Sequence, residues 1–146
     1  MSIDVVDIDH VALRVTDIDA SLEFYHDLLG LPVRDRERYE NGEVPYVAVV
    51  AGGRHLHLVP VDGEHEDTSE ALQAGNPPVG GEHICLLVRS SDVDTRAQLE
   101  RLLETVESAG YEVEPREPRK RYGAYGRDWA AYVRDPDGRR VELKLH

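Results

Sequence analysis

The clearest pattern along the chain is a strand-like alternation of apolar residues that gives way to helical spacing and then to further strands. In residues 11–15 every second residue is apolar, Asp17 or Asp19 is placed to cap a helix, and apolar residues then recur every three or four positions until Gly30. The stretches "VPYVAVVAGG" and "RHLHLVPV" predict two strands joined at a Gly-Gly turn. The first half is therefore predicted to be a strand, a helix and three strands.

The second half repeats this order. A strand is expected from His83, Ser91 or Asp92 is the expected helix cap, and an apolar helix stripe ends at Gly110. The segments "YEVEPR", "DWAAYV" and "RRVELKL" follow as predicted strands. Between the last two stands Asp-Pro-Asp-Gly at 135–138, with Pro and Gly at the positions that a type I turn favours.

This repetition predicts an α+β fold of two tandem βαβββ modules. We expect a single domain over 1–146, with module 1 at about 5–61, a linker at about 62–80 and module 2 at about 81–146. Neither module alone can bury both faces of its sheet, so pairing is expected within the chain or between chains. His10 and His83 open the first strands of their modules, and His57 and Glu142 lie midway along the last strands.

Composition narrows the possible partners. The 146 residues are 40% apolar, and 29 acidic residues against 17 basic ones give a net charge of −12. Such a charge argues against nucleic acid or an anionic membrane as a partner. No transmembrane segment or signal peptide is recognisable, so the cytoplasm is the expected location. Cys85, the one cysteine, is expected to be a small buried hydrophobic residue.

The four repeat-related positions carry metal-ligating residue types. If the modules pack around a pseudo-twofold axis, His10, His57, His83 and Glu142 converge on one point. Three imidazoles and a carboxylate suit Zn, Ni, Co, Mn or Fe(II), and the absence of a thiolate argues against a purely structural zinc site. An octahedral ion with four protein ligands keeps two positions for a chelating substrate. The opposing interpretation is that these are ordinary strand histidines and an exposed glutamate.

Two stretches, "DHVALRVTDIDASLEFYHDLLGLPV" and "WAAYVRDPDGRRVEL", resemble the vicinal oxygen chelate superfamily, which includes glyoxalase I, extradiol dioxygenases and bleomycin-binding proteins. The resemblance implies paired βαβββ modules that form a cupped mixed sheet around a divalent metal ion. Its four ligand positions fall on His10, His57, His83 and Glu142. His55 shares the strand face of His57 and is expected to contact substrate, and a different register would exchange the two histidines.

For this family, the leading expectation is a metal-dependent lyase or isomerase that acts on a small oxygen-chelating substrate through a metal-stabilised enediolate. Glu142, the one carboxylate among the four, would be both ligand and catalytic base. Arg14 matches an arginine that contacts the substrate carboxylate in glyoxalase I. Val61 replaces the asparagine expected four residues after the second ligand, which argues against glutathione as cosubstrate.

Two alternatives remain open. An Fe(II) extradiol-type dioxygenase would use only His10, His83 and Glu142 as ligands, leaving three positions for catecholate and oxygen. A metal-free drug-binding resistance protein would use none of them. The resemblance also implies a homodimer, in which the metal site forms within one chain or across two.

The segment "PREPRKRYGAYGRD", residues 115–128, is expected to be a loop that is basic and aromatic on an acidic chain. Arg121, Tyr122 and Tyr125 are candidates for a lid that attracts an anionic substrate. A solvated hairpin is the competing interpretation. Trp129, which follows the segment, is a further candidate for the cavity wall.

Overall fold

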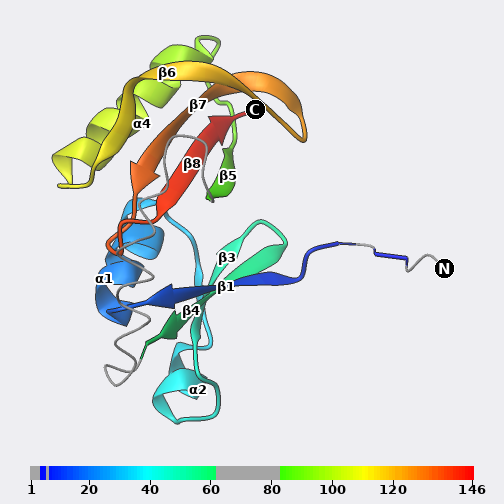
Figure 1. The fold of residues 1–146 in the computed structure, drawn as a ribbon, viewed down its shortest axis with the longest axis vertical. Helices are drawn as coiled ribbons and strands as arrows, with labels where there is room; N and C mark the ends of the chain where they lie inside the picture. The colour runs from blue at the N-terminus through cyan, green and yellow to red at the C-terminus, as the bar shows by residue number, and fades with distance from the viewer. Residues whose placement is uncertain (1–3, 6, 62–82) are drawn as a thin grey trace. The chain divides into compact units, whose positions relative to one another are not determined.

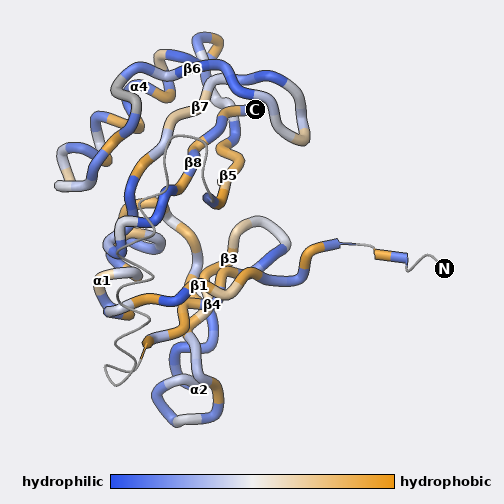
Figure 2. The backbone as a smooth tube through the Cα atoms, viewed as in Figure 1, coloured by the Kyte–Doolittle hydropathy of each residue, from blue (hydrophilic) through white to orange (hydrophobic). Residues whose placement is uncertain are grey.

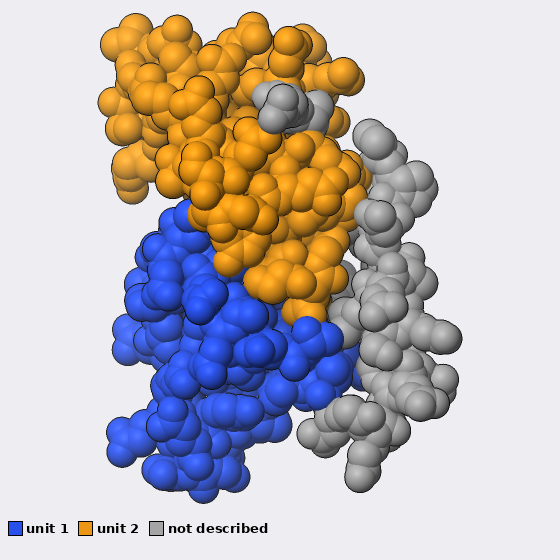
Figure 3. All heavy atoms as spheres, turned by 90° about the vertical axis from the view of Figure 1, so that its left-hand side faces the viewer, with its two compact units in different colours: residues 1–66 blue, residues 67–146 orange. Residues whose placement is uncertain are grey.

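A computed structural model describes residues 4–5, 7–61 and 83–146. The chain divides into two compact units, Met1–Glu66 and Asp67–His146 (Figure 3). The predicted linker at 62–80 lies outside the described residues. The interpretation of both modules as one domain stays a prediction.

Unit 1 contains a four-stranded mixed sheet (Figure 1). Its elements are β1 (His10–Val15), α1 (Ile18–Leu22), a π-helix η1 (Glu23–Leu28), β2 (Val33–Arg34), α2 (Arg36–Glu40), β3 (Val47–Ala51) and β4 (Arg54–Pro60). The strand order is β1-β4-β3-β2, and β1 runs parallel to β4 while the other pairs are antiparallel.

Unit 2 repeats this topology. Its elements are β5 (Ile84–Val88), α4 (Thr95–Ser108), β6 (Val113–Gly123), β7 (Gly126–Arg134) and β8 (Arg140–Leu145). The strand order is β5-β8-β7-β6, again with the first and last strands parallel and the others antiparallel. The predicted α+β fold of two βαβββ modules is confirmed, with α2 as an addition that the sequence pattern did not indicate.

One face of each sheet is apolar because strand side chains alternate. In β4, Leu56 and Leu58 are buried, and their partners Val47 and Val49 on β3 are fully buried beside them. In unit 2 the buried residues of β8 include Val141, Leu143 and Leu145, and α4 contributes Leu99, Leu103 and Val106 to the core. The opposite face of each sheet is therefore available to polar side chains.

The first helix differs from the regular helix that the spacing predicted. Asp17 is its cap, accepting a hydrogen bond from the Ala20 N–H at 3.0 Å. Beyond Leu22 the helix widens into η1, where the N–H of Leu29 donates to the carbonyl of Phe24. The extra residue per turn places the consecutive residues Phe24 and Tyr25 both in the core.

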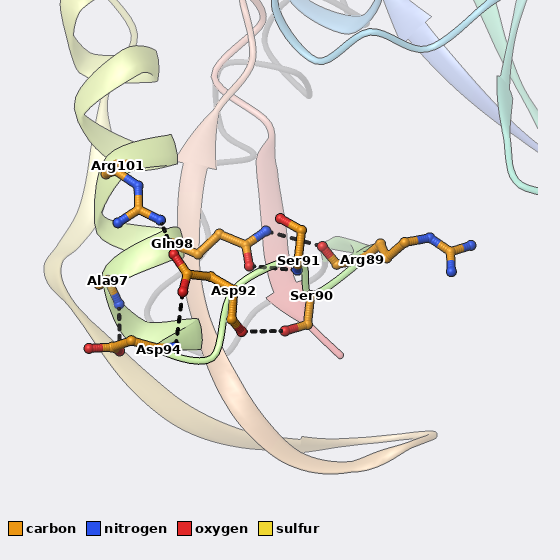
Figure 4. A network of polar contacts seen from close by, with 8 residues as sticks. All are labelled: Arg89, Ser90, Ser91, Asp92, Asp94, Ala97, Gln98 and Arg101. Atoms are coloured by element: carbon orange, nitrogen blue, oxygen red, sulfur yellow. Dashed lines mark hydrogen bonds and ion pairs between the residues drawn. The ribbon is translucent and has the colours of Figure 1, made fainter.

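The start of α4 corrects one prediction (Figure 4). The cap is Asp94, whose side chain accepts from the Ala97 N–H at 3.0 Å, rather than Ser91 or Asp92. Asp92 instead pairs with Arg101 at 2.6 Å, and the backbone N–H of Ser91 donates to the side chain of Gln98. The sequence offers three cap-type residues within four positions, and these competing side-chain contacts decide among them.

The segment 115–128 is not a loop, since most of it forms a β-hairpin, as the competing interpretation expected. β6 and β7 pair as far as Gly123 and Gly126, beyond the last β7–β8 pair at Ala130 and Lys144. β6 is an edge strand with a register shift between Glu114 and Arg119, an arrangement that tolerates its two prolines. Figure 2 shows β6 as largely hydrophilic, and its charged residues had obscured the strand pattern.

The turn at 135–138 is confirmed. Gly138 donates its N–H to the carbonyl of Asp135 at 2.9 Å and has a φ of 79°. The side chain of Asp135 also accepts from the N–H groups of Asp137 and Arg139. Cys85, by contrast, is exposed, so its predicted burial in the core is wrong. Among the described residues, no helix combines the length and apolar character needed to cross a bilayer.

Candidate metal centre

In unit 1 the structure brings together two of the four predicted ligands. The rings of His10 on β1 and His57 on β4 stack with their centroids 4.1 Å apart. The two strands are parallel neighbours, and His10 pairs with His55 while Ala12 pairs with His57. The histidine contact is therefore diagonal, from His10 to the residue two positions beyond its direct partner.

Two neighbours hold these rings. The carboxylate of Asp9 lies 2.6 Å from Nδ1 of His10, and because a carboxylate only accepts hydrogen bonds, it favours the tautomer in which Nδ1 carries the proton and Nε2 the lone pair. Tyr46, directly before β3, stacks on His57 with centroids 3.8 Å apart. His57 thus lies between the rings of Tyr46 and His10.

The environment of His57 favours its neutral form. Burial lowers the pKa of His57, and the positive charge that His10 and His55 can carry lowers it further. A neutral imidazole is the form that binds metal ions. For both stacked rings to bind one ion they must tilt, because a metal ion lies near the plane of each imidazole that binds it.

In unit 2 the structure brings together the other two predicted ligands. Nε2 of His83 lies 2.9 Å from Oε2 of Glu142, whose side chain is 7% exposed. The ring of His83 also meets the ring of Tyr132 edge-on, with centroids 5.2 Å apart. Tyr132 on β7 is the direct cross-strand partner of Glu142 on β8.

The registers of the two sheets relate these pairs to one another. Ile84 pairs with Val141, so His83, one residue earlier, aligns with Arg140 just as His10 aligns with His55. Two positions further on, His57 corresponds to Glu142. Both units therefore join the head of the first strand to the equivalent position of the last strand, and His55 corresponds to Arg140.

The Glu142 face of unit 2 is also strongly cationic. Arg140 and Arg121 lie over the ring of Tyr132, at 4.2 and 4.8 Å from its centroid. Arg140 is paired with Glu114, which also accepts two hydrogen bonds from Arg134. Partial burial raises the pKa of Glu114, but the bond from Arg134 and the charges of both arginines outweigh this and lower it.

The remaining predicted site residues are spread over both units. His55 lies on the same strand face as His57, with ring centroids 6.0 Å apart, and Arg14 is exposed on the β1 face that carries His10. Tyr122 and Tyr125 are exposed near the tip of the β6–β7 hairpin.

Trp129 lies on the opposite face of its sheet from Tyr132 and Glu142, because it precedes Ala130 and side chains alternate. It packs between Arg96 of α4 and Lys120 of β6. The structure does not bring Trp129 together with the Glu142 pair.

Sequence reasoning missed several residues of these faces. Asp9 could have been noticed as the carboxylate next to His10 in "IDH". Tyr46 and Tyr132 follow from strand register, which the sequence does not reveal. Lys144, two residues after Glu142, is almost fully buried, and its Nζ donates to the carbonyls of Arg121 and Gly126 at 2.7 and 2.6 Å.

Over the part of the chain that the structure describes, no group of three or more His, Cys, Asp or Glu side chains is close enough to hold a metal ion. Each unit holds one pair of the predicted ligand side chains, His10 with His57 and His83 with Glu142. The donor types fit a divalent transition metal, and the hydrogen bond that Nδ1 of His10 donates to Asp9 directs Nε2 of His10 as metal ligands require.

Comparison with known proteins decides the family. Residues 7–143 match the profile of the Glyoxalase/Bleomycin resistance protein/Dioxygenase superfamily. This chain belongs to that superfamily. It is 30% identical to a probable lactoylglutathione lyase of Synechocystis over 92% of this chain and 91% of that protein. It is 26% identical to a virulence protein of Salmonella typhimurium, over 95% of this chain and 83% of the relative.

Solved structures agree with the superfamily fold. An integron cassette protein of V. cholerae superposes with a TM-score of 0.66 at 23% identity, covering 100% of this chain and 99% of that one. The lactoylglutathione lyase of Agrobacterium tumefaciens superposes with a TM-score of 0.56 at 21% identity, covering 97% and 95%. At these identities the likeness shows the fold alone.

Proposed function

We propose that this protein is a divalent-metal-dependent lyase or isomerase acting on a small oxygen-chelating substrate. The observation that carries the proposal is the matched pairing of His10 with His57 and of His83 with Glu142 at equivalent positions of the two sheets. The similarity to a probable lactoylglutathione lyase supports the same class of chemistry.

In this proposal the four side chains are ligands of one ion, formed within a chain or across a homodimer. When bound, a divalent ion would stabilise negative charge that develops on a substrate oxygen. The carboxylate of Glu142 accepts a proton from the hydroxyl-bearing carbon next to the substrate carbonyl and returns it to the carbonyl carbon, while the hydroxyl proton moves to the former carbonyl oxygen; returned to the same carbon, the proton gives epimerisation instead. A buried carboxylate beside an imidazole can move a proton without exchange with bulk water.

The test is an anaerobic metal-loading series with Ni, Zn, Mn, Co and Fe(II). Each sample is assayed with methylglyoxal adducts of glutathione and of other thiols, with acyl-CoA epimers and with catechols. Isomerisation or epimerisation by the loaded protein, lost in E142Q, supports the proposal. Turnover that survives equally in E142Q would contradict the role of Glu142.

A second candidate, an Fe(II) ring-cleaving dioxygenase, is favoured by one observation. His57 is held between Tyr46 and His10, an arrangement that suits a residue outside the ligand set. His10, His83 and Glu142 would then supply the two histidines and one carboxylate typical of such enzymes. Oxygen consumption with catechol, retained in H57Q, would select this function.

A further inference from the structure

An arginine side chain on the Glu142 face has a buried donor that the described residues do not satisfy. Nε of Arg121 is buried and has no hydrogen-bond partner among the residues that the structure describes. Its guanidinium carbon lies over the ring of Tyr132, 4.8 Å from the ring centroid. A buried N–H without an acceptor is costly, so such a group is typically completed by a ligand or water.

The fully buried cations of this face are already engaged. Arg140 is paired with Glu114, and Lys144 donates to two backbone carbonyls. Tyr132 joins Arg121 to the proposed site, because it is the cross-strand partner of Glu142 and meets the ring of His83. Arg119 shares this face but is exposed, whereas Arg121 directs a buried, unsatisfied donor to it, so Arg121 is the cation we place next to Glu142.

Lys144 fixes the backbone that carries Arg121. Its Nζ bonds to the carbonyl of Arg121 on β6 and to that of Gly126 on β7, which joins both arms of the hairpin just before the turn. Gly123 makes room for this contact, since a Cβ there would lie 3.0 Å from the Lys144 Nζ. Lys144 is in this sense a positioning residue for Arg121.

We propose that Arg121, positioned by Lys144, is a binding subsite for a carboxylate group of the substrate, beside the oxygen atoms that Glu142 would face. A single carboxylate matches the unsatisfied Nε donor of Arg121 and the edge of its guanidinium. The nearby carboxylates of Glu114 and Glu142 disfavour a more highly charged anion. The catalytic use of this subsite rests on the function proposed above, whereas the anion binding itself does not.

The test is a ¹⁵N NMR titration of the full chain in its metal-free form, prepared with a chelator that is then removed. The Arg121 Nε–H resonance is assigned by its loss in R121K. We expect acetate to shift it saturably, while acetamide and an equal ionic strength of NaCl leave it in place. R127K changes an arginine that lies over the exposed Tyr122 and is the matched control.

A resonance that responds alike to acetate and chloride, or to neither, would overturn the subsite. For the positioning role, K144M and G123A should each weaken acetate binding at least fivefold, and unchanged affinity in either would contradict it. G123A affects only the end of the Lys144 side chain, so it keeps the test valid if K144M fails to fold. If the protein binds no metal ion, the proposed function is wrong, but the result of this titration of the metal-free protein does not change.

Discussion

Nε2 of His83 and Oε2 of Glu142 lie 2.9 Å apart, although the two residues are 59 positions apart in the sequence. His10 and His57 stand in the equivalent relationship in the other sheet, as the two parallel registers show. The repeat thus preserves a contact between strand positions while changing the chemistry from imidazole–imidazole to imidazole–carboxylate. This conserved geometry is the basis for treating the four residues as one functional set.

Asp9 should matter for metal binding without touching the ion. Its hydrogen bond to Nδ1 of His10 fixes the tautomer that presents Nε2. We expect D9N to weaken the affinity for Zn or Ni by about 10–100-fold, the usual cost of losing such a partner. Isothermal titration calorimetry measures this, with D4N, an exposed aspartate, as the control. Equal affinities of D9N and D4N would argue against an ordering role for Asp9.

His57 should make the stability of the metal-free protein depend on pH. Burial lowers its pKa in the folded state below the unfolded value of about 6.5. The contribution of neutral His57 to the free energy of unfolding is complete at pH values above the unfolded pKa. It is lost as the pH falls through the lower folded pKa, because the unfolded chain binds the proton first. Urea unfolding between about pH 7.5 and 5 should show a shallower decline for H57Q. Parallel curves for both proteins would disprove this.

Glu114 should stabilise unit 2 through its two arginine partners. The side chains of Arg134 and Arg140 are 9% and 1% exposed, and both donate to this carboxylate. We expect E114Q to lower the free energy of unfolding by about 1–3 kcal/mol, since hydrogen bonds between charged groups are lost. E112Q, at an exposed neighbouring position, should change it little. Denaturant titration measures the free energy of unfolding of each variant, and an equal decrease in E114Q and E112Q would contradict a stabilising role for Glu114.

The carboxylate of Glu114 should also make the stability of the protein depend on pH in the acid range. The pKa of Glu114 is lowered in the fold, so its contribution is complete above the unfolded pKa and disappears as the pH falls through the folded value. The difference in stability between wild type and E114Q should therefore shrink in acid. A difference that stays constant down to about pH 2 would exclude this linkage.

The reactivity of the Cys85 thiol should depend on the charge of Glu142. Although the residue is exposed at the surface, desolvation by the surrounding protein raises the pKa of its thiol to about 11, with a further increase from the charge of Glu142 and an opposing effect of Lys144. At pH 8 its reaction with a thiol reagent should be about two orders of magnitude slower than that of a free cysteine, because little thiolate is present. E142Q should accelerate the reaction. A rate that equals that of free cysteine would show that the thiol is not perturbed.

The fold could be predicted because local chemistry and global topology agree. Alternation, helix stripes and the Asp-Pro-Asp-Gly turn each specify their elements without reference to distant residues. The sequence alone could not show which residue caps α4, because the contacts of Asp92 and Ser91 depend on Arg101 and Gln98, a helical turn or more away. Similarly, the hairpin at 115–128 is set by pairing with β7, which overrides two prolines and a run of charges.

The candidate ligands could be found from the repeat, but their surroundings could not. Strand register places Tyr132 beside Glu142 and Trp129 on the other face, and a shift of one residue would exchange them. Tyr46 and Lys144 act through contacts across strands, which no local pattern encodes. Hence the sequence indicates the chemistry of the site, and the structure supplies its supporting residues.

The most direct test of the central claim is the stoichiometry of metal binding by the full chain, measured by calorimetry and elemental analysis with Zn and Ni. A single shared site predicts one tightly bound ion per chain, with binding lost or reduced by at least about 100-fold in both H10A and H83A, more than the loss of a residue that only orients a ligand costs. One ion that is lost only in variants of one unit, two weak ions per chain, or no bound ion would contradict a single site built from His10, His57, His83 and Glu142.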